Sequence, residues 1–337
     1  MGPRVSVLLP LRNAAATLDE CITSIQSQSL QDFELLAIND GSSDQTLAIL
    51  ERYADRDQRL RILSNPGKGL VDALNYGLAQ AGSPLIARID GDDRMHTERL
   101  SRQLAFLQQN PNVTLVASQA RIFPEEQLQA GFREYIRWQN RCLSAAEIAH
   151  NIYIESPFPH PSVTFRRTPI IQIGGYRQGP FPEDYDLWLR LHQAGHRMEK
   201  LPHKLLDWRE SPGRVSRTDP RCSREAFDSL RARYLAKEPR LLERRHDLVV
   251  WGAGRKTRKR CRYLLDYGFK VNAWIDIDPR KIGNRIDNAP VVDPEWLNQK
   301  KRPFVLVYVN NHGARELIGE QLSSFGYRVE KDFLMVG

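Results

Sequence analysis

The stretch LIARIDGDDRM, residues 85–95, runs from an apolar segment directly into three carboxylates within four positions. The three acids are Asp90, Asp92 and Asp93. Its first half has the length and composition of a strand that is buried on both faces. Acids this close together repel one another, and only Arg88 and Arg94 lie near enough in the sequence to neutralise them. The stretch therefore predicts a buried strand that ends in a concentrated negative charge.

Strand-like and helix-like patterns alternate outward from this stretch over the first 123 residues. Apolar runs typical of buried strands are 5–11, 33–40, 60–65, 84–90 and 113–123. Between them, apolar residues recur at helical spacing in 18–25, 47–54, 70–78 and 100–107. Thr17 and Glu20 have the spacing of a capping box, and Asp44 is expected to cap the second helix. The alternation predicts a parallel sheet covered by helices.

Such a sheet brings its acids together. Parallel strands end at the same edge, where ligands bind, so Asp40 after the second strand and Asp90 after the fourth are expected to share one rim. A solvated turn is the alternative for the sequence GDD. An EF-hand loop is excluded because its sixth position is Met95 instead of Gly. Crowded acids are tolerated when Mg²⁺ or Mn²⁺ lies among them with phosphate oxygens as further ligands.

Composition limits the class of protein. A length of 337 residues with 41% apolar residues predicts one large or two ordinary folded domains. The four cysteines are scattered without a CxxC pair, which favours free thiols. No apolar run reaches the ~18 residues of a membrane-spanning helix. The net charge of +8 suits phosphate ligands or an anionic membrane surface, while no nucleic-acid-binding module is visible. We expect a cytoplasmic protein that can contact the inner face of the membrane peripherally.

The chain divides into three segments by pattern. We predict a first domain over 1–218, a helical connector over 219–246 and a small Rossmann-like domain over 247–337. The last begins with GAGRKT, in which Thr257 replaces the third glycine of a dinucleotide fingerprint, and Asp276 follows at the distance of a ribose-binding acid. Nucleotide binding and a purely structural or oligomerisation role both remain open for this domain. The basic run RKTRKRCR predicts a solvated helix face or a contact with phosphate or anionic lipid.

Several ordered blocks carry a family resemblance. They are VSVLLPLRNAAATLDECITSIQSQSLQDFELLAINDGSSDQT, NPGKGLVDALNYGLAQA, ARIDGDDRMHTERLSRQLAFL and, in the second half, HPSVTFRR, GGYR and PEDYDLWLRLHQAGH. Together they resemble the family 2 glycosyltransferases from residue 4 to about residue 215. The resemblance implies a GT-A fold, which is a nucleotide-binding α/β/α sandwich.

The resemblance also implies roles for individual acids. Asp40 would bind the base of a nucleotide-sugar donor, and Asp90 would bind its ribose and diphosphate region. Asp92 would hold Mn²⁺ or Mg²⁺. Asp184 would be the catalytic base. We predict further donor contacts at Leu11, Asn13, Lys68 and Gly91, and acceptor or donor contacts at His160, Glu183 and Arg209.

These residues also have plainer interpretations. Asp184 lies in the first turn of a predicted helix, where the helix dipole favours any acid. Lys68 and Asn13 are residue types common in turns, and His160 lies between two prolines in what could be a rigid surface loop. Arg209, with two arginines that follow it, could form a basic lid over the diphosphate.

The predicted function is therefore an inverting, metal-dependent transfer of a sugar from a nucleotide diphosphate, with a UDP-sugar as the expected donor. The acceptor would be a hydroxyl of a glycan or a lipid-linked sugar, in the synthesis of bacterial surface polysaccharide. The alternatives are an NAD-dependent oxidoreductase centred on the C-terminal domain, a nucleotidyltransferase, and a non-catalytic sugar-nucleotide-binding protein. The nucleotidyltransferase is disfavoured because PLRNAAAT lacks a glycine-rich basic loop after the first strand.

Overall fold

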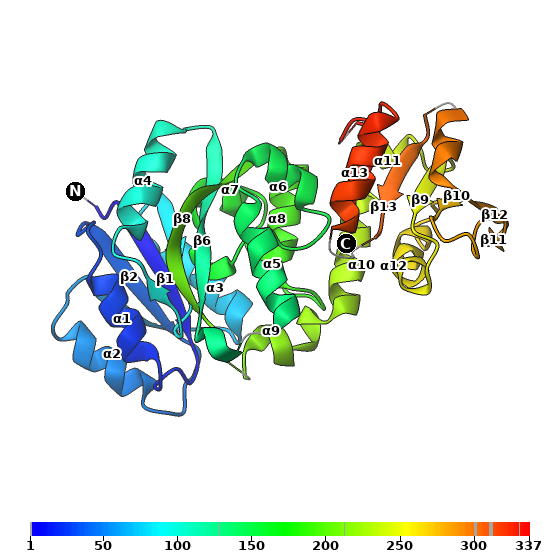
Figure 1. Cartoon of the computed structure of the whole chain (residues 1–337). Coiled ribbons are helices and arrows are strands. Elements are labelled where there is room, and N and C mark those ends of the chain that lie inside the picture. The colour runs from blue at the N-terminus through cyan, green and yellow to red at the C-terminus, as the bar shows by residue number, and fades with distance from the viewer. Residues whose placement is uncertain (1, 128, 212, 300–301, 310–312, 330) are drawn as a thin grey trace. The chain divides into compact units, whose positions relative to one another are not determined.

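The computed structural model describes residues 2–127, 129–211, 213–299, 302–309, 313–329 and 331–337. The chain forms two compact units, each with its own sheet (Figure 1). The first unit comprises residues 1–148 and 156–218, and the second comprises 149–155 and 219–337. The segment 219–246 contains a short 3-10 helix (Pro220–Cys222) and two α-helices, α10 (Arg224–Leu235) and α11 (Pro239–Leu242), and it groups with the second unit.

The sheet of the first unit has eight strands in the order β3-β2-β1-β4-β7-β6-β8-β5. They are β1 (Val5–Leu11), β2 (Phe33–Asn39), β3 (Leu60–Ser64), β4 (Leu85–Arg88), β5 (Arg94–Met95), β6 (Val113–Phe123), β7 (Thr164–Arg166) and β8 (Arg197–Arg209). The first four in this order are parallel, as the sequence predicts. Beyond β4 the sheet is mixed. β7, which lies outside the residues for which a parallel sheet is predicted, runs antiparallel to both β4 and β6, so β6 keeps the direction of β4. Two helices, Ala130–Arg141 and Ala145–Asn151, and then a proline-rich loop connect β6 to β7.

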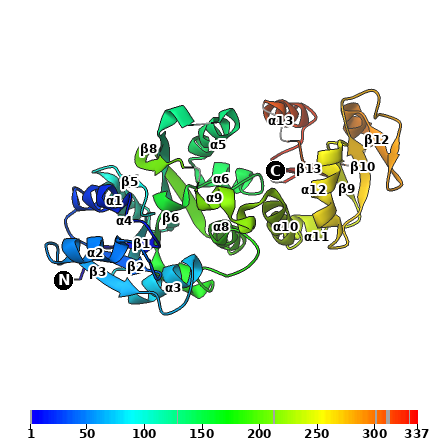
Figure 2. The ribbon, with the colours of Figure 1, turned by 90° about the horizontal axis from the view of Figure 1, so that it is seen from below.

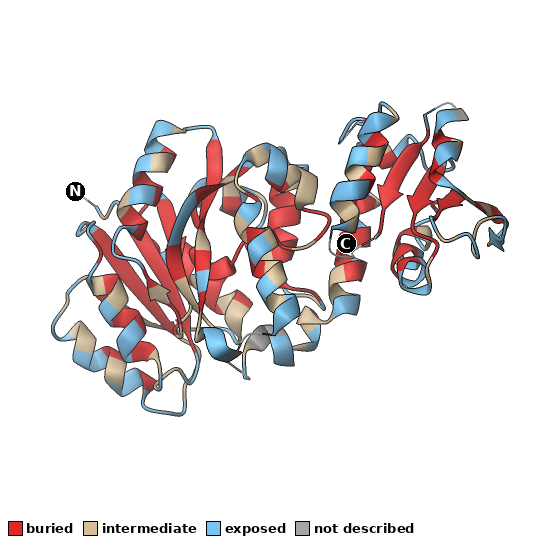
Figure 3. Ribbon diagram, viewed as in Figure 1, coloured by how far each residue is buried: buried red, intermediate tan, exposed pale blue. Residues whose placement is uncertain are grey.

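Helices cover both faces of this sheet (Figure 2). They are α1 (Leu18–Gln26), α2 (Thr46–Ala54), α3 (Leu70–Gln80), α4 (Arg99–Gln109), α5 (Ala130–Arg141), α6 (Ala145–Asn151), α7 (Arg167–Gln172), α8 (Glu183–Gln193) and α9 (Val215–Thr218). One buried cluster joins alternate residues of β1 and β2 to α1, α2 and α4. On the other face α3 approaches closely, since a Cβ on Gly77 would lie 3.0–3.1 Å from Ile38 and Leu8. Every residue of β1 is buried (Figure 3), so this strand is the centre of the core.

The start of α1 differs from the prediction. Thr17 precedes the helix but makes no side-chain capping bond. Its hydroxyl instead donates to the carbonyl oxygen of Gly91 at 2.9 Å, and Glu20 binds Arg209 at 2.7 Å. The predicted capping box is therefore wrong, because both side chains make tertiary contacts with the acid-rich loop after β4 and with the end of β8. At the second helix the N-cap is Gln45 instead of the predicted Asp44, and it makes no side-chain capping bond. Asp44, one residue earlier, still accepts from the backbone N–H of Thr46.

The second unit contains a six-stranded sheet in the order β11-β12-β10-β9-β13-β14. The strands are β9 (Leu248–Trp251), β10 (Val271–Ile275), β11 (Arg285–Ile286), β12 (Ala289–Val292), β13 (Phe304–Val307) and β14 (Phe333–Met335), with helices α12 (Arg255–Leu265) and α13 (Ala314–Ser324). All its pairings are parallel except that of β11 with β12. β9 pairs with β10 on one side and with β13 on the other. This arrangement agrees with the predicted smaller Rossmann-like fold.

All four cysteines are free thiols, as their scattered positions predict. None of the helices within the described residues combines the length and apolar character needed to cross a lipid bilayer.

Candidate active site

The rim expected from the sequence is present at the carboxyl ends of three neighbouring strands. β1 pairs in parallel with β2 on one side and with β4 on the other. The backbone N–H of Asp40 donates to Leu11 at 2.8 Å, and that of Ile89 donates to Leu8 at 3.1 Å. The loops that carry Asp40 and Asp90 therefore leave the same edge of the sheet, on either side of β1.

The acids after β4 form one tight cluster. Carboxylate oxygens of Asp90, Asp92 and Asp93 lie within 4.8 Å of one another. Asp93 is only 1% exposed; its Oδ1 accepts from the backbone N–H of Arg209 at 2.7 Å, while its buried Oδ2 has no hydrogen-bond partner. A buried carboxylate oxygen without a partner is costly. It marks the cluster as incomplete without a further ligand.

Burial and mutual repulsion disfavour the ionised forms of Asp92 and Asp93 in this cluster. Burial, followed by the charge of Asp90, raises the pKa of Asp92 to about 6. Burial and the charge of Asp92 also raise the pKa of Asp93. A divalent cation among the three carboxylates would remove this repulsion, and oxygen ligands are those that Mg²⁺ and Mn²⁺ prefer. The donor set therefore fits such an ion.

A buried arginine that the sequence analysis treated only as a neighbouring charge lies at the centre of the site. The guanidinium of Arg88 is 2.5 Å from the carboxylate of Asp90, and its side chain is 3% exposed. Its charge also acts to lower the pKa of Asp184 and contributes to lowering that of His160. The cation of Arg88 thus interacts with residues from the end of β4, from the start of α8 and from the loop before β7.

Asp184 lies in the first turn of α8, as Pro182 and the acids after it predict. Burial, and then the charge of Glu183, raise the pKa of Asp184 to about 7. Its Oδ1 accepts from the backbone N–H of Tyr185 at 2.7 Å, which holds the carboxyl group in place. A carboxyl that titrates near neutrality can accept a proton at physiological pH.

His160 is buried, so its interpretation as a surface histidine is wrong. It is 7% exposed, its Nε2 lies 3.0 Å from the hydroxyl of Tyr176, and its Nδ1 lies 3.8 Å from Glu183. Its ring also contacts the edge of Trp188. Burial, and then the charge of Arg88, lower the pKa of His160, which keeps the ring neutral. Tyr176 was not foreseen, because no sequence pattern places it opposite the PHP loop.

The other end of the rim carries the residues predicted to contact the nucleotide. Both carboxylate oxygens of Asp40 accept from the backbone N–H of Gly69 at 3.0 Å, and Oδ1 also accepts from Asn65 at 2.7 Å. These bonds hold the NPGKG turn against the end of β2. Lys68 stands exposed in this turn. Arg12 lies 3.7 Å from Asp40 on the same edge.

The loop after β1 is closed by Asn13. Its side-chain oxygen accepts from the backbone N–H of Ser43, and its own N–H donates to Ser42. Asn13 has a positive φ of 53°, a conformation that asparagine adopts more readily than most residues. Nearby, a Cβ on Gly91 would lie 2.4 Å from the end of the Leu11 side chain, so a larger residue here would force Leu11 to move. The chain thus brings the ends of β1 and β4 into direct contact.

Arg209 binds the protein around the acid cluster. Its Nε donates to the carbonyl oxygen of Asp92 at 2.7 Å, and its other end donates to Glu20. Glu210, which the sequence analysis did not single out, is buried and pairs with Arg214 at 3.3 Å and Arg217 at 2.6 Å. The charge of Arg214 acts to lower the pKa of Asp92, so this arginine lies near the cluster.

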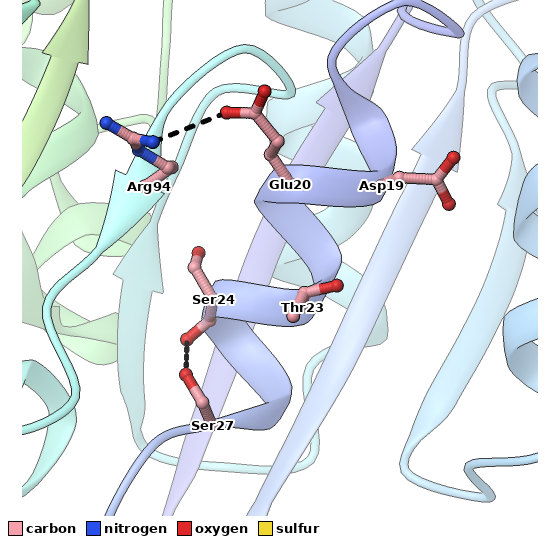
Figure 4. Close-up of a pocket in the computed structure, with 6 residues that line it drawn as sticks. All are labelled: Asp19, Glu20, Thr23, Ser24, Ser27 and Arg94. Carbon is pink, nitrogen blue, oxygen red and sulfur yellow. Dashed lines mark hydrogen bonds and ion pairs between the residues drawn. The ribbon is translucent and has the colours of Figure 1, made fainter.

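Arg94 does not neutralise the acid cluster as its sequence position suggested. It pairs with Glu20 at 3.5 Å and with Asp207 at 3.4 Å. Figure 4 shows Arg94 reaching towards Glu20 on α1. A hollow of about 440 Å³ lies here. The hollow is lined by Asp19, Glu20, Thr23, Ser24, Ser27 and Arg94. None of the three clustered acids lines it, so it is distinct from the candidate active site.

Comparison with known proteins agrees with this geometry. The sequence model of glycosyl transferase family 2 matches residues 6–174, which is half of the chain. The chain is 30% identical over 215 residues to the amylovoran biosynthesis glycosyltransferase AmsE of Erwinia amylovora, covering 63% of this chain and 78% of that one. It is 28% identical over 212 residues to an Escherichia coli UDP-Gal:alpha-D-GlcNAc-diphosphoundecaprenol beta-1,3-galactosyltransferase, covering 62% and 75%.

Two solved structures share the GT-A fold at low sequence identity. Staphylococcus aureus TarS 1–349 in complex with UDP-GlcNAc has a TM-score of 0.54 at 15% identity, covering 78% of this chain and 80% of that one. The mannosyltransferase PcManGT from Pyrobaculum calidifontis, in complex with GDP-Man and Mn²⁺, has a TM-score of 0.51 at 18% identity, covering 80% and 69%. The family model, the relatives and the fold agree. The chain is a glycosyltransferase that belongs to glycosyl transferase family 2.

Proposed function

We infer that the protein is an inverting, divalent-metal-dependent glycosyltransferase that uses a UDP-sugar. The acceptor is a hydroxyl of a glycan or a lipid-linked sugar, and the setting is the synthesis of bacterial surface polysaccharide on the cytoplasmic side of the membrane, with peripheral contact. One observation carries this proposal. The buried Arg88 lies beside the three clustered acids and also interacts with Asp184, a carboxyl group whose pKa is about 7.

The donor would lie along the rim from β2 to β4. Asp40, which fixes the NPGKG turn, would bind the base, while Leu11 and Asn13 would line the path of the nucleoside. Lys68 is exposed on that turn and would contact phosphate. Gly91 lets the backbone after β4 approach the donor, and Asp90 would bind the ribose and diphosphate region.

A divalent cation fits beside the diphosphate. Asp92 would be its principal ligand, since burial and then the charge of Asp90 disfavour its ionised form, and a bound cation would stabilise that form. Mn²⁺ or Mg²⁺, when bound, supplies a Lewis acid that stabilises the charge on the leaving diphosphate. Arg209 holds the backbone of Asp92 and so keeps this ligand in position.

Asp184 would act as the base. It accepts the proton of the acceptor hydroxyl while that oxygen forms a bond to the anomeric carbon and the bond from that carbon to the diphosphate oxygen breaks. The attack comes from the face opposite the leaving group, so the anomeric configuration inverts. Glu183 and the neutral ring of His160 lie beside Asp184 and would position the acceptor or the donor sugar.

The named relatives bear on the donor. The Escherichia coli relative uses UDP-galactose by its name, and TarS has been solved with UDP-GlcNAc. PcManGT was solved with GDP-Man, which makes a GDP-sugar the main competing donor.

The proposal is tested by a panel of UDP- and GDP-sugars with Mn²⁺ or Mg²⁺ and a lipid-linked or free saccharide acceptor, with released nucleotide as the readout. We expect turnover with a UDP-sugar that stops when EDTA is added. Thermal unfolding is followed in parallel with UDP and Mn²⁺, and with NAD⁺. Turnover with GDP-sugars alone would overturn the UDP assignment, and stabilisation by NAD⁺ alone would overturn the proposed site.

A further inference from the structure

The second unit contains a cavity of about 300 Å³ that the transfer reaction does not use. It lies beside the carboxyl ends of β9 and β12 and the first turns of α12. Its lining residues are Ala253, Gly254, Arg255, Arg258, Lys281, Asn284, Ile286 and Val291. In open parallel sheets this edge is where small ligands bind.

Three of the side chains that line this cavity are positively charged, and two of them are not paired with a carboxylate within the described residues. Arg255 and Arg258 are exposed on α12, and within the described part of the chain neither forms an ion pair. Lys281, the third cation, pairs with Asp276 at 3.0 Å. Three other basic residues of α12 do have carboxylate partners, while Lys256, outside the cavity, has none within the described residues. These pairs are Lys259 with Glu225, Arg260 with Asp228 and Arg262 with Asp266.

The distribution of charge along the chain also indicates a surplus of positive charge in the second unit. Residues 1–218 contain 25 Lys and Arg and 25 Asp and Glu, whereas residues 219–337 contain 24 and 16. The whole net charge of +8 therefore lies in the segment 219–337. A concave surface of one sign concentrates counter-ions of the other sign. Three cations of this basic segment, Arg255, Arg258 and Lys281, line the cavity.

The acid that a dinucleotide fingerprint would offer to a ribose is already engaged. The carboxylate of Asp276 accepts from the backbone N–H groups of Ala253 at 3.0 Å and of Asp278 at 3.0 Å, and from Lys281. Gly252 adopts a φ of 113°, and a Cβ there would lie 2.9 Å from the hydroxyl of Thr257. These contacts fix the turn before α12 and leave the cations, and no free acid, facing the cavity.

We propose that this cavity binds a phosphate-bearing small molecule through Arg255, Arg258 and Lys281. The side chains of Ile286 and Val291 give it an apolar wall against which the non-phosphate part of the ligand packs. Arg255 and Arg258 are one turn apart on α12, so both guanidinium groups can reach one phosphate or diphosphate. The site is separate from the transfer reaction and does not depend on it.

The test uses the full chain in EDTA, which removes the metal that the proposed transfer site needs for a diphosphate. Calorimetric titrations are made with inorganic phosphate, inorganic diphosphate and UDP, and binding to phosphatidylglycerol vesicles is measured separately. The double variant Arg255→Ala/Arg258→Ala is compared with Lys256→Ala/Arg262→Ala, which removes the same charge from the same helix away from the cavity.

We expect saturable binding of at least one free phosphate compound in EDTA. The cavity variant should weaken it at least tenfold, the matched control less than threefold, and sugar transfer with metal present should be unchanged in both. The proposal is overturned if no phosphate compound binds in EDTA, if both double variants weaken binding equally, or if only vesicles bind, which would make the basic face a membrane contact.

Discussion

The two units carry opposite charges at the carboxyl ends of their parallel strands. In the first, the loop after β4 presents Asp90, Asp92 and Asp93, and one buried carboxylate oxygen lacks a partner. In the second, the turn after β9 leads into Arg255 and Arg258. Both places lie where parallel strands end beside a glycine-containing turn. The edge of a parallel sheet therefore determines where a ligand binds, while the side chains placed there determine which ligand it is.

Asp92 and Asp276 show the same contrast within one residue type. Burial and the charge of Asp90 raise the pKa of Asp92 to about 6. Burial also acts to raise the pKa of Asp276, but hydrogen bonds from the backbone of Asp278, from Lys281 and from Ala253 outweigh it and lower the pKa. The ionised form of Asp92 is therefore disfavoured by its surroundings, whereas hydrogen bonds from the protein stabilise the ionised form of Asp276. This difference supports the proposed ligand role of Asp92 and a structural role of Asp276.

The largest effect is expected at the start of α8. Asp184→Asn removes the proposed base and should lower turnover at least ~1000-fold, in the range of general-base catalysis with its positioning. Binding of UDP with Mn²⁺ should stay within a few-fold, because the acid cluster is unchanged. Released nucleotide and calorimetric titration measure the two properties. Turnover near that of the parent protein would refute the assignment of Asp184.

The pH dependence of transfer should follow the same carboxyl. Asp184 must be ionised to accept a proton and its pKa is about 7, so at saturating metal kcat/KM should fall roughly tenfold per pH unit below that value. Glu183→Gln removes a neighbouring negative charge that raises this pKa, and should move the acidic limb to lower pH. If the acidic limb of the pH profile does not move in this variant, Asp184 is not the group that causes the pH dependence.

An intermediate effect, on stability alone, is expected in the second unit. Asp276→Asn removes a charge that accepts two backbone N–H groups and Lys281, and should cost about 1–3 kcal/mol of unfolding free energy. Transfer at 25 °C should be unchanged. Calorimetric unfolding measures the cost, with Asp266→Asn on the exposed side of α12 as a control that stays near the parent. A loss of transfer with full stability would give Asp276 a functional role.

The smallest effect should follow the loss of Arg94. This arginine forms two partly exposed ion pairs away from the acid cluster, and such pairs contribute about 0–1 kcal/mol. Arg94→Ala should therefore leave turnover within about twofold and the metal concentration for half-activity unchanged. A marked shift in metal dependence would place Arg94 among the residues that balance the clustered acids.

Local patterns predicted much of this protein. The strands from β1 to β4 and the helices between them follow directly from apolar periodicity, and Pro182 with its following acids marks the start of α8. The pattern could not predict the antiparallel direction of β7, because a three-residue strand carries no signal for the side from which it enters the sheet. Nor could it predict that His160 is buried against Tyr176, since burial depends on residues far away in the sequence.

The sequence alone determined the family, the two-part organisation, and the placing of acids at the ends of β2 and β4, because strand periodicity and motif order are local properties. Only the tertiary structure decided which charges meet. It placed Arg88 among Asp90, Asp184 and His160, and it gave Asp276 partners that Asp92 lacks. The physical reason is that the energy of a charge depends on its burial and on neighbours within a few ångströms, and folding brings those neighbours together from distant parts of the chain.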